Sequence, residues 1–469
     1  MNFQYIKKLL SQIMFVFLFL SFVGLYACGN PESKQEKIQT ESSSEVNKTE
    51  QQTENSKENV QKESIAQDAG EQPKEAIQET LKEAIQETPK EEIQETPKET
   101  KPTQKHVAFV LNSNYIKGSY SLVDLDKKQA IKKDVVGVHS DAVVAVWKDL
   151  IFVLNRYNNP KKDDELLILD QKTMSLLHTI KLGAKTNPQD VAVVDKTKAY
   201  VSLYGSKDLF IINPTDGKIT GKLDLSGFIE KSTKQCKKDA DCKDKYGNGS
   251  GVCDVANSKC QSDGTPEMSK LLIQNKKLYV LIQGLDRNQG YLPLQSTIAL
   301  FDTSSDQLIK SIPLKGTNPC AFIAEPSGSF LINELGQAFS PKDGILERLD
   351  TKKDVMNGIV FEEKTINASF SMFAVAVVSN KIGYLVANDA SFKQMLIQFS
   401  LDTGKQTKQL IKDAKLSDMM LYNKQLWVAD KTLKGLRIFD AITGAELSQS
   451  PVLTGHLPPI YMKILPSIF

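Results

Sequence analysis

The sequence has few of the side chains that most often carry out chemistry. Its 469 residues include only four histidines, two tryptophans and six cysteines. None of the histidines stands in a His-x-x-x-His pair or a serine–histidine pattern, and no Gly-x-Ser-x-Gly elbow or glycine-rich phosphate loop is present. The chain therefore lacks the signatures of metalloproteases, serine hydrolases and nucleotide-binding enzymes, and we expect a binding protein rather than an enzyme.

The charge pattern gives no sign of nucleic acid binding. The formal net charge is only +2, made up of +2 over residues 1–28, −7 over residues 29–105 and +7 over residues 106–469. Lysines of the second part are scattered through its expected turns, which is typical of a solubilising surface. We expect no nucleic acid partner, although a mildly basic domain could bind an anionic polysaccharide, lipid headgroups or an acidic protein.

The only long apolar run lies at the N-terminus. Lys7 and Lys8 precede an apolar stretch over about residues 13–23, and Leu-Tyr-Ala-Cys ends at Cys28. A basic start, a short apolar core and small residues at its end are typical of a secretory signal peptide, and the run is short for a membrane span. The sequence predicts an exported protein.

The Leu-Tyr-Ala-Cys motif resembles a bacterial lipobox, in which the cysteine becomes the lipidated first residue of the mature chain. This resemblance implies a signal peptide over 1–27 and an acylated Cys28, whose buried methylenes would each contribute about 0.8 kcal/mol to membrane attachment. A plain signal peptide with an incidental cysteine is the alternative. Gly29 implies the outer membrane, on its periplasmic or surface face, if the cell has two membranes, and otherwise the outer face of the cell membrane.

Residues 28–105 are expected to form a disordered tether. The segment is rich in Glu, Lys, Gln, Thr and Ser and has no aromatic residue, so it cannot bury enough apolar surface to offset its chain entropy. Degenerate eight-residue repeats favour transient helix, but Pro89 and Pro97 interrupt them.

Residues 106–469 repeat a pattern with a period of about 45 residues, which indicates the blades of a β-propeller. The clearest copy, over 189–225, has four short apolar or alternating runs separated by polar and glycine turns, the pattern of a four-stranded antiparallel meander. Seven copies can be counted, and we expect an all-β, seven-bladed propeller. The second strands are expected at 107–112, 150–155, 198–204, 278–282, 330–333, 382–387 and 426–430.

The first copy lacks an inner strand, because only charged linker precedes His106. The last copy is followed by a surplus apolar run over 459–465. We therefore expect the C-terminal run to supply the inner strand of blade one and to close the ring, which removes exposed sheet edges.

The recurring order of Asn-Pro, an apolar strand, a Tyr-Val strand, Ile-Ile-Asn or Leu-Phe-Asp, and Thr-Asp-Gly-Lys resembles YVTN-repeat propellers. The resemblance covers about 106–469 and is strongest around 189–225. It implies a seven-bladed propeller of the kind found in bacterial surface proteins, with lactonase-like propellers as wider relatives. Most members of the family act as extracytoplasmic binding scaffolds, so the resemblance leaves activity open.

Four cysteines, Cys236, Cys242, Cys253 and Cys260, crowd into one interruption of the repeat at about 229–265. A loop of this length with no apolar core would be conformationally flexible, and two disulfides are the simplest way to order it in an exported protein. Three pairings remain open. Zinc is disfavoured because no Cys-x2-Cys knuckle occurs. Calcium at Asp239, Asp241 and Asp244 has suitable oxygens, although the glycine and terminal glutamate of an EF-hand are missing.

The remaining cysteine, Cys320, is expected to be a buried thiol outside the disulfides.

Acidic residues open three of the expected inner strands, at Asp141, Asp190 and Asp418. Inner strands line the channel of a propeller, so these carboxylates could hold a cation or a polar ligand at its mouth. The alternative is that they accept hydrogen bonds from neighbouring backbone amides.

These observations predict a cell-envelope lipoprotein whose tethered, monomeric propeller binds a protein or an envelope polymer. Two alternatives stay open: a periplasmic enzyme of lactonase-like or quinoprotein-like type, and an accessory subunit of an envelope assembly complex. Apart from calcium, no cofactor is expected.

Overall fold

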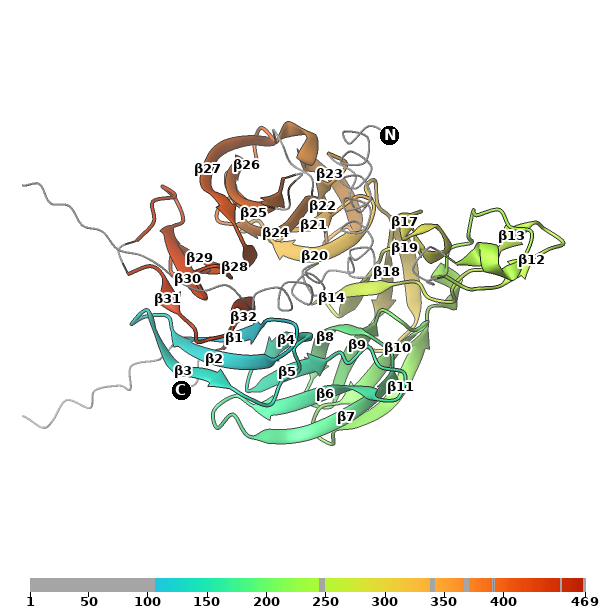
Figure 1. Cartoon of the computed structure of the whole chain (residues 1–469), viewed down its shortest axis with the longest axis horizontal. Coiled ribbons are helices and arrows are strands. Elements are labelled where there is room, and N and C mark those ends of the chain that lie inside the picture. The colour runs from blue at the N-terminus through green and yellow to red at the C-terminus, as the bar shows by residue number, and fades with distance from the viewer. Residues whose placement is uncertain are drawn as a thin grey trace, which may run out of the picture. The chain divides into compact units, whose positions relative to one another are not determined.

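The computed structural model describes residues 106–243, 249–337, 342–366, 371–389, 391, 393–447 and 449–466. Their strands form seven four-stranded antiparallel sheets set around a common axis (Figure 1), so the predicted seven-bladed propeller is confirmed. The signal peptide, Cys28 and tether expected within residues 1–105 lie outside the described residues.

Each blade runs from an inner to an outer strand, and the blades follow one another in chain order. The first blade contains β1 (Val107–Ser113), β2 (Gly118–Asp124) and β3 (Gln129–Val135), and its inner strand comes from the C-terminus, as described below. The second contains β4 (Ala142–Trp147), β5 (Leu150–Asn155), β6 (Asp163–Asp170) and β7 (Leu176–Ala184). The third contains β8 (Pro188–Asp195), β9 (Lys198–Leu203), β10 (Asp208–Asn213) and β11 (Lys218–Asp224). The fourth and fifth contain β14 (Met268–Gln274), β15 (Lys277–Ile282), β18 (Thr297–Asp302), β19 (Leu308–Pro313); and β20 (Pro319–Ala324), β21 (Phe330–Glu334), β22 (Ile345–Asp350), β23 (Val355–Glu362). The last two contain β24 (Ser371–Val377), β25 (Ile382–Asn388), β26 (Gln394–Ser400), β27 (Lys405–Ala414); and β28 (Leu416–Tyr422), β29 (Gln425–Asp430), β30 (Gly435–Asp440), β31 (Val452–Leu453).

The apolar pattern of each strand reflects its place in the blade. A second strand is covered by the blades on both sides, and its side chains are therefore apolar on both faces, as at Phe152, Tyr200 and Trp427, which have no exposed surface. The outer strands are exposed and carry lysines such as Lys408 and Lys412 on β27. Charged side chains on an edge strand disfavour pairing with another chain.

The ring closes through β32 (Pro459–Ile464), which is the inner strand of blade one. β32 pairs antiparallel with β1, with Ala108 opposite Ile464 and Leu111 opposite Tyr461. Each inner strand also contacts the inner strand of the next blade around the whole ring. The predicted closure by the C-terminal run is confirmed.

Tyrosines of the second strands connect neighbouring blades. The buried Tyr279 hydroxyl donates to Asp354 Oδ1 at 2.5 Å, and Lys277 Nζ reaches the other oxygen of the same carboxylate. Asp354 lies in the turn between the third and fourth strands of blade five. The pairing explains why a tyrosine recurs two residues after a lysine in the repeat, and the same arrangement joins blades three and four through Lys198, Tyr200 and Asp306.

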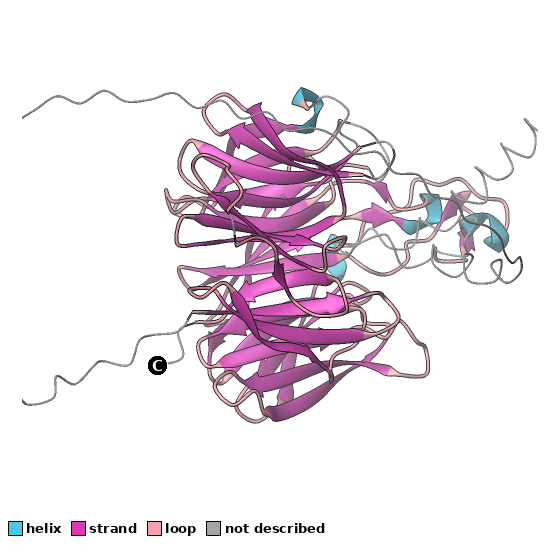
Figure 2. Cartoon of the chain, turned by 60° about the vertical axis from the view of Figure 1, so that its left-hand side comes forward, coloured by secondary structure: helices cyan, strands magenta, loops and turns pink. Residues whose placement is uncertain are grey.

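The propeller has two distinct faces. In a meander, the loops that join the second to the third strand, and the outer strand to the next inner strand, lie on one face. The Cys-rich insertion lies in such a loop, between β11 and β14, and projects from one side of the stacked strands (Figure 2). We call this side the module face. His106 precedes a second strand and therefore lies on the other side, which we call the N-terminal face; Leu465 lies beside it, donating its amide to Val107 O at 2.8 Å.

Two small hairpins and four short 3-10 helices complete the described residues. They are β12 (Cys253–Asp254) with β13 (Lys259–Cys260), β16 (Leu285–Asp286) with β17 (Leu292–Pro293), and η1 (Ser226–Phe228), η2 (Asp239–Cys242), η3 (Arg287–Gln289) and η4 (Glu363–Thr365). Among the residues described, no helix has the length and apolar character needed to cross a membrane.

Candidate functional site

Asp190 and Asp418 occupy the same structural position in different blades. Asp190 accepts the amide of Val191 at 3.0 Å and, from the next inner strand, the amide of Leu271 at 3.1 Å. Asp418 likewise accepts the amides of Met419 and Met462, each at 2.8 Å. Each carboxylate thus joins its own inner strand to the inner strand of the following blade.

This arrangement has a physical reason. The inner strand of a blade has one edge without a sheet partner, so some of its amides need another acceptor. Asp190 and Asp418 provide that acceptor. This agrees with the alternative that these carboxylates accept hydrogen bonds from neighbouring backbone amides. Burial raises the pKa of Asp418, while Lys463 and the two amides counteract this.

Asp141 belongs to a different group of side chains. It lies just before β4 and pairs with the guanidinium of the buried Arg156, whose Nη1 also donates to Gln189 Oε1 at 3.2 Å. Burial disfavours the charge of Arg156, but the adjoining carboxylate of Asp141 raises the pKa of this arginine above its ordinary value. Burial lowers the pKa of the nearby His139, although the Asp141 carboxylate acts in the opposite direction.

Asp141, Asp190 and Asp418 are thus each engaged with a neighbouring amide or guanidinium, and the binding of a cation or polar ligand at the channel mouth stays a prediction. Arg156 was not identified from the sequence, and the only signal for it is its position just after the second strand of blade two.

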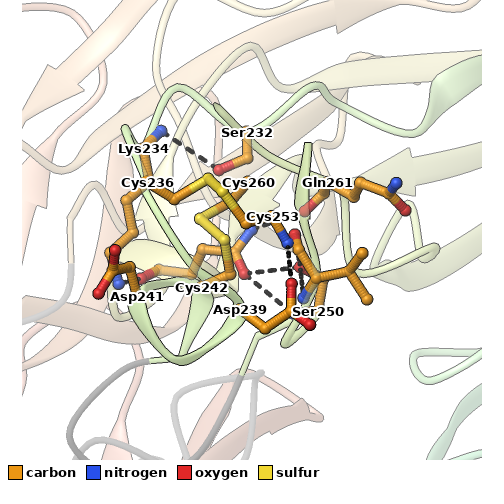
Figure 3. The surroundings of a disulfide bond; sticks show 12 residues. Ser232, Lys234, Cys236, Asp239, Asp241, Cys242, Ser250, Cys253, Cys260 and Gln261 are labelled. Carbon is orange, nitrogen blue, oxygen red and sulfur yellow. Dashed lines mark hydrogen bonds between the residues drawn. A yellow bond between two sulfur atoms is a disulfide. The ribbon is translucent and has the colours of Figure 1, made fainter. Parts of the chain in front are cut away.

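The four clustered cysteines form two disulfides, Cys236–Cys253 and Cys242–Cys260, with Cα–Cα distances of 5.9 and 5.3 Å. The bridges cross in sequence, and the four buried sulfur-bearing side chains pack together as the core of the insertion (Figure 3). The expectation of disulfides is confirmed, and the pairing is now defined. We call the segment 229–265 the Cys module.

Oxidised cysteines offer no thiolate to zinc. The sulfurs of Cys236, Cys242 and Cys253 are the only group of three close metal-ligating atoms among the described residues, and all three are in disulfides. Cys320 is buried and outside any disulfide, and its Sγ accepts a hydrogen bond from the side-chain Nδ2 of Asn333 at 3.4 Å.

The aspartates considered for calcium cap backbone amides within the Cys module. Asp239 accepts the amide of Cys253 at 2.8 Å, and Asp241 accepts the amide of Lys237 at 2.9 Å. Asp244 lies outside the described residues. Calcium binding stays a prediction, and two of its three proposed ligands already have structural partners.

The Cys module docks on the loop that joins β15 to β18, over residues 283–296. Asn288 is the centre of this contact: it is buried, its Oδ1 accepts the amide of Ser250 at 2.8 Å, and its Nδ2 donates to Gln261 O at 2.8 Å. Lys234 Nζ donates to the carbonyl of Asn288 at 2.7 Å. The Cys module is therefore attached by specific polar contacts.

A second contact fixes the base of the Cys module. Arg287 Nε lies 3.2 Å from Glu267 and 3.5 Å from Asp263, and its guanidinium stacks over the Tyr204 ring at 5.1 Å. Burial raises the pKa of Glu267 to about 8, although Arg287 acts in the opposite direction. The Cys module and the 283–296 loop thus form one structured platform on the module face, and we take this platform as the candidate site.

Comparison with known proteins agrees with the fold. No family model and no curated protein matches the chain. A putative 6-phosphogluconolactonase from Bacteroides fragilis NCTC 9343 matches with a TM-score of 0.52 at 14% identity, over 79% of this chain and 100% of that one. Another from Bacteroides uniformis ATCC 8492 has a TM-score of 0.51 at 10% identity, over 77% and 100%. Apo AztD from Citrobacter koseri has a TM-score of 0.47 at 12% identity, over 78% and 99%.

The chain is therefore a seven-bladed propeller that resembles lactonase-like propellers in fold. At these identities the likeness concerns architecture alone, so function has to be argued from the site.

Proposed function

We propose that this protein is a cell-envelope lipoprotein whose propeller presents the Cys module and the adjoining 283–296 loop to a partner. One observation carries the proposal: the platform lies on the module face, whereas residue 106, where the expected tether joins the propeller, lies on the N-terminal face. A domain anchored through Cys28 would thus hold its platform away from the anchor.

The construction of the platform supports a binding role. The propeller supplies a rigid base, and the two disulfides order a segment that has no apolar core other than its sulfurs. Polar loops held on a rigid scaffold are the usual location of binding residues. Ordering a loop in advance also lowers the entropy cost of binding.

The proposal can be tested by removing the Cys module without disturbing the blades. The amide of Cys260 donates to the carbonyl of Lys234 at 3.0 Å. In a two-residue hairpin turn, the residue after the turn donates its amide to the carbonyl of the residue before the turn in the same way. Replacing residues 235–259 with Asn-Gly, together with Cys260→Ser, should therefore close the chain without strain. Lys234 and Gln261, which contact Asn288, are kept.

Partners captured from solubilised envelopes by the full chain would be identified, purified and measured in direct binding to both proteins. We expect the excised variant to melt within a few degrees of the parent chain and to bind the partner at least about tenfold more weakly. Unchanged affinity in a folded variant would overturn the proposal. Hydrolysis of 6-phosphogluconolactone by the purified chain, undiminished by the excision, would favour the enzyme alternative instead.

A further inference from the structure

The Cys module is nearly neutral in sequence, with seven lysines and six acidic residues over 229–265. The structure separates these charges. Among its described residues, five lysines are exposed, against a single exposed acidic residue, Asp239. Among the exposed charged side chains of the Cys module, lysines therefore predominate although its composition is balanced.

Four of the acidic side chains accept hydrogen bonds from backbone amides of the Cys module. Such charge-assisted hydrogen bonds hold these carboxylates in place. The amide donors belong to the Cys module itself: Cys253 to Asp239 at 2.8 Å, Lys237 to Asp241 at 2.9 Å, Asn257 to Asp254 at 3.2 Å, and Thr265 to Asp263 at 2.9 Å.

The exposed lysines, in contrast, form no ion pair with any residue that the structure describes. They are Lys231, Lys237, Lys238, Lys243 and Lys259.

Apolar surface lies beside one of these lysines, Lys259. Val255 is 67% exposed and Val252 is 41% exposed, on and next to the β12–β13 hairpin that also carries Lys259. Both valines are in the segment that the two disulfides hold in place. A fixed combination of unpaired ammonium groups and exposed valines matches a ligand that has both carboxylates and apolar side chains.

We propose that the Cys module binds an acidic polypeptide segment of another molecule, with its lysines facing carboxylates and its valines facing apolar side chains. This inference rests on the proposed function and names the chemistry of the partner. A polysaccharide or polyphosphate would satisfy the lysines but would give the valines no apolar contact. The proposal commits to a separate molecule; residue 106, where the chain's own acidic segment joins the propeller, lies on the N-terminal face.

The test uses the detergent-solubilised full chain and a fluorescent copolymer of glutamate and tyrosine, with polyphosphate as the non-peptide polyanion. Affinity is measured by fluorescence anisotropy over a range of salt concentrations. The module variant is Lys237→Glu, Lys238→Glu and Lys259→Glu. A matched control reverses three exposed outer-strand lysines instead, Lys132→Glu, Lys133→Glu and Lys412→Glu, which changes the net charge by the same amount.

We expect the module variant to lose about tenfold or more in affinity for the copolymer and to lose most of its salt dependence, while the control stays within about twofold of the parent. Val255→Ser should weaken copolymer binding by about threefold without affecting polyphosphate binding. Equal losses in the module and control variants would overturn the inference, because they would show a response to net charge alone. Equal affinity for polyphosphate and the copolymer, unaffected by Val255→Ser, would also overturn it.

The excised variant separates this inference from the proposed function. If excision abolishes binding of the purified partner while the lysine reversals do not weaken it, the platform binds but the acidic partner is wrong. If excision leaves partner binding unchanged, the proposed function itself is wrong.

Discussion

The substitution Glu334→Gln should stabilise the propeller at neutral pH. Glu334 ends β21 opposite Ile345 of β22, its carboxyl group interacts with that of Glu347 two residues further along β22, and neither glutamate has exposed surface. Neither oxygen of Glu334 has a hydrogen-bond partner of good geometry, whereas Glu347 accepts the amide of Lys315 at 3.1 Å. Burial, reinforced by the Glu347 carboxylate, raises the pKa of Glu334 to about 9.

The sign of the effect follows from linkage. The folded state holds a proton on Glu334 that the unfolded chain releases near the ordinary value of 4.5, so stability is greatest below that pH and is lost progressively as the pH rises toward 9. Each pH unit in this window lowers the free energy of unfolding by about 1.4 kcal/mol, so Glu334 makes the protein about 3 kcal/mol less stable at pH 7 than at pH 4.5. Glutamine has the same shape, stays neutral and can donate to Glu347, so it removes this dependence.

Urea denaturation at pH 5, 7 and 8.5 measures the effect. We expect the midpoint of Glu334→Gln to exceed that of the parent at pH 7 and 8.5, and the two to approach each other at pH 5. Glu362→Gln is the control, because Glu362 is 37% exposed and, among the described residues, forms its ion pair with the exposed Lys364, a contact that contributes little to stability. Parallel pH profiles for Glu334→Gln and the parent would refute the reasoning.

Three further predictions concern closure, the contacts between blades, and the anchor. Deleting residues 458–469 removes β32 and exposes β1, so the melting temperature should fall by at least about 10 °C, and an unchanged melting curve would show that the ring closes without β32. Tyr279→Phe should cost about 1 kcal/mol in urea denaturation, but Asp354→Ala should cost about 3 kcal/mol because it leaves both Tyr279 and Lys277 without their acceptor; equal costs would contradict the shared contact. Cys28→Ala should move the protein out of the membrane fraction, and full retention there would show that another attachment exists.

The fold could be predicted from the sequence because each blade repeats a local pattern. A middle strand such as β29 is buried on both faces by its neighbours and reads as a continuous apolar run, while an outer strand such as β27 is largely exposed and polar. The missing first strand and the surplus last run identified the closure, because a ring of four-stranded blades needs the same number of strands in each. Repetition makes such missing and extra elements visible in a single sequence.

The contacts between blades could not be predicted, because their partners are separated by roughly a whole blade or more. Tyr279 meets Asp354 across 75 residues, and Asp190 meets the amide of Leu271 across 81 residues. The sequence shows that Asp190 and Asp418 recur at the start of inner strands, but a recurrent carboxylate fits a ligand site and a structural hydrogen bond equally well. Only the register of neighbouring blades decides which amide each one meets.

The contacts within the platform could not be predicted from the sequence either. The Cys module interrupts the repeat visibly, and the second interruption, over 283–296, is visible as an unusually long gap between the second and third strands of blade four. The topology brings them together: the loop before an inner strand, and the loop after the second strand of the same blade, lie on one face of a propeller. Asn288 could then have been suspected as a contact residue. That its amide satisfies the backbone of the Cys module, while five of the module's lysines are exposed and most of its carboxylates are partly buried, depends on a chain path fixed by two disulfides, and composition alone does not encode that path.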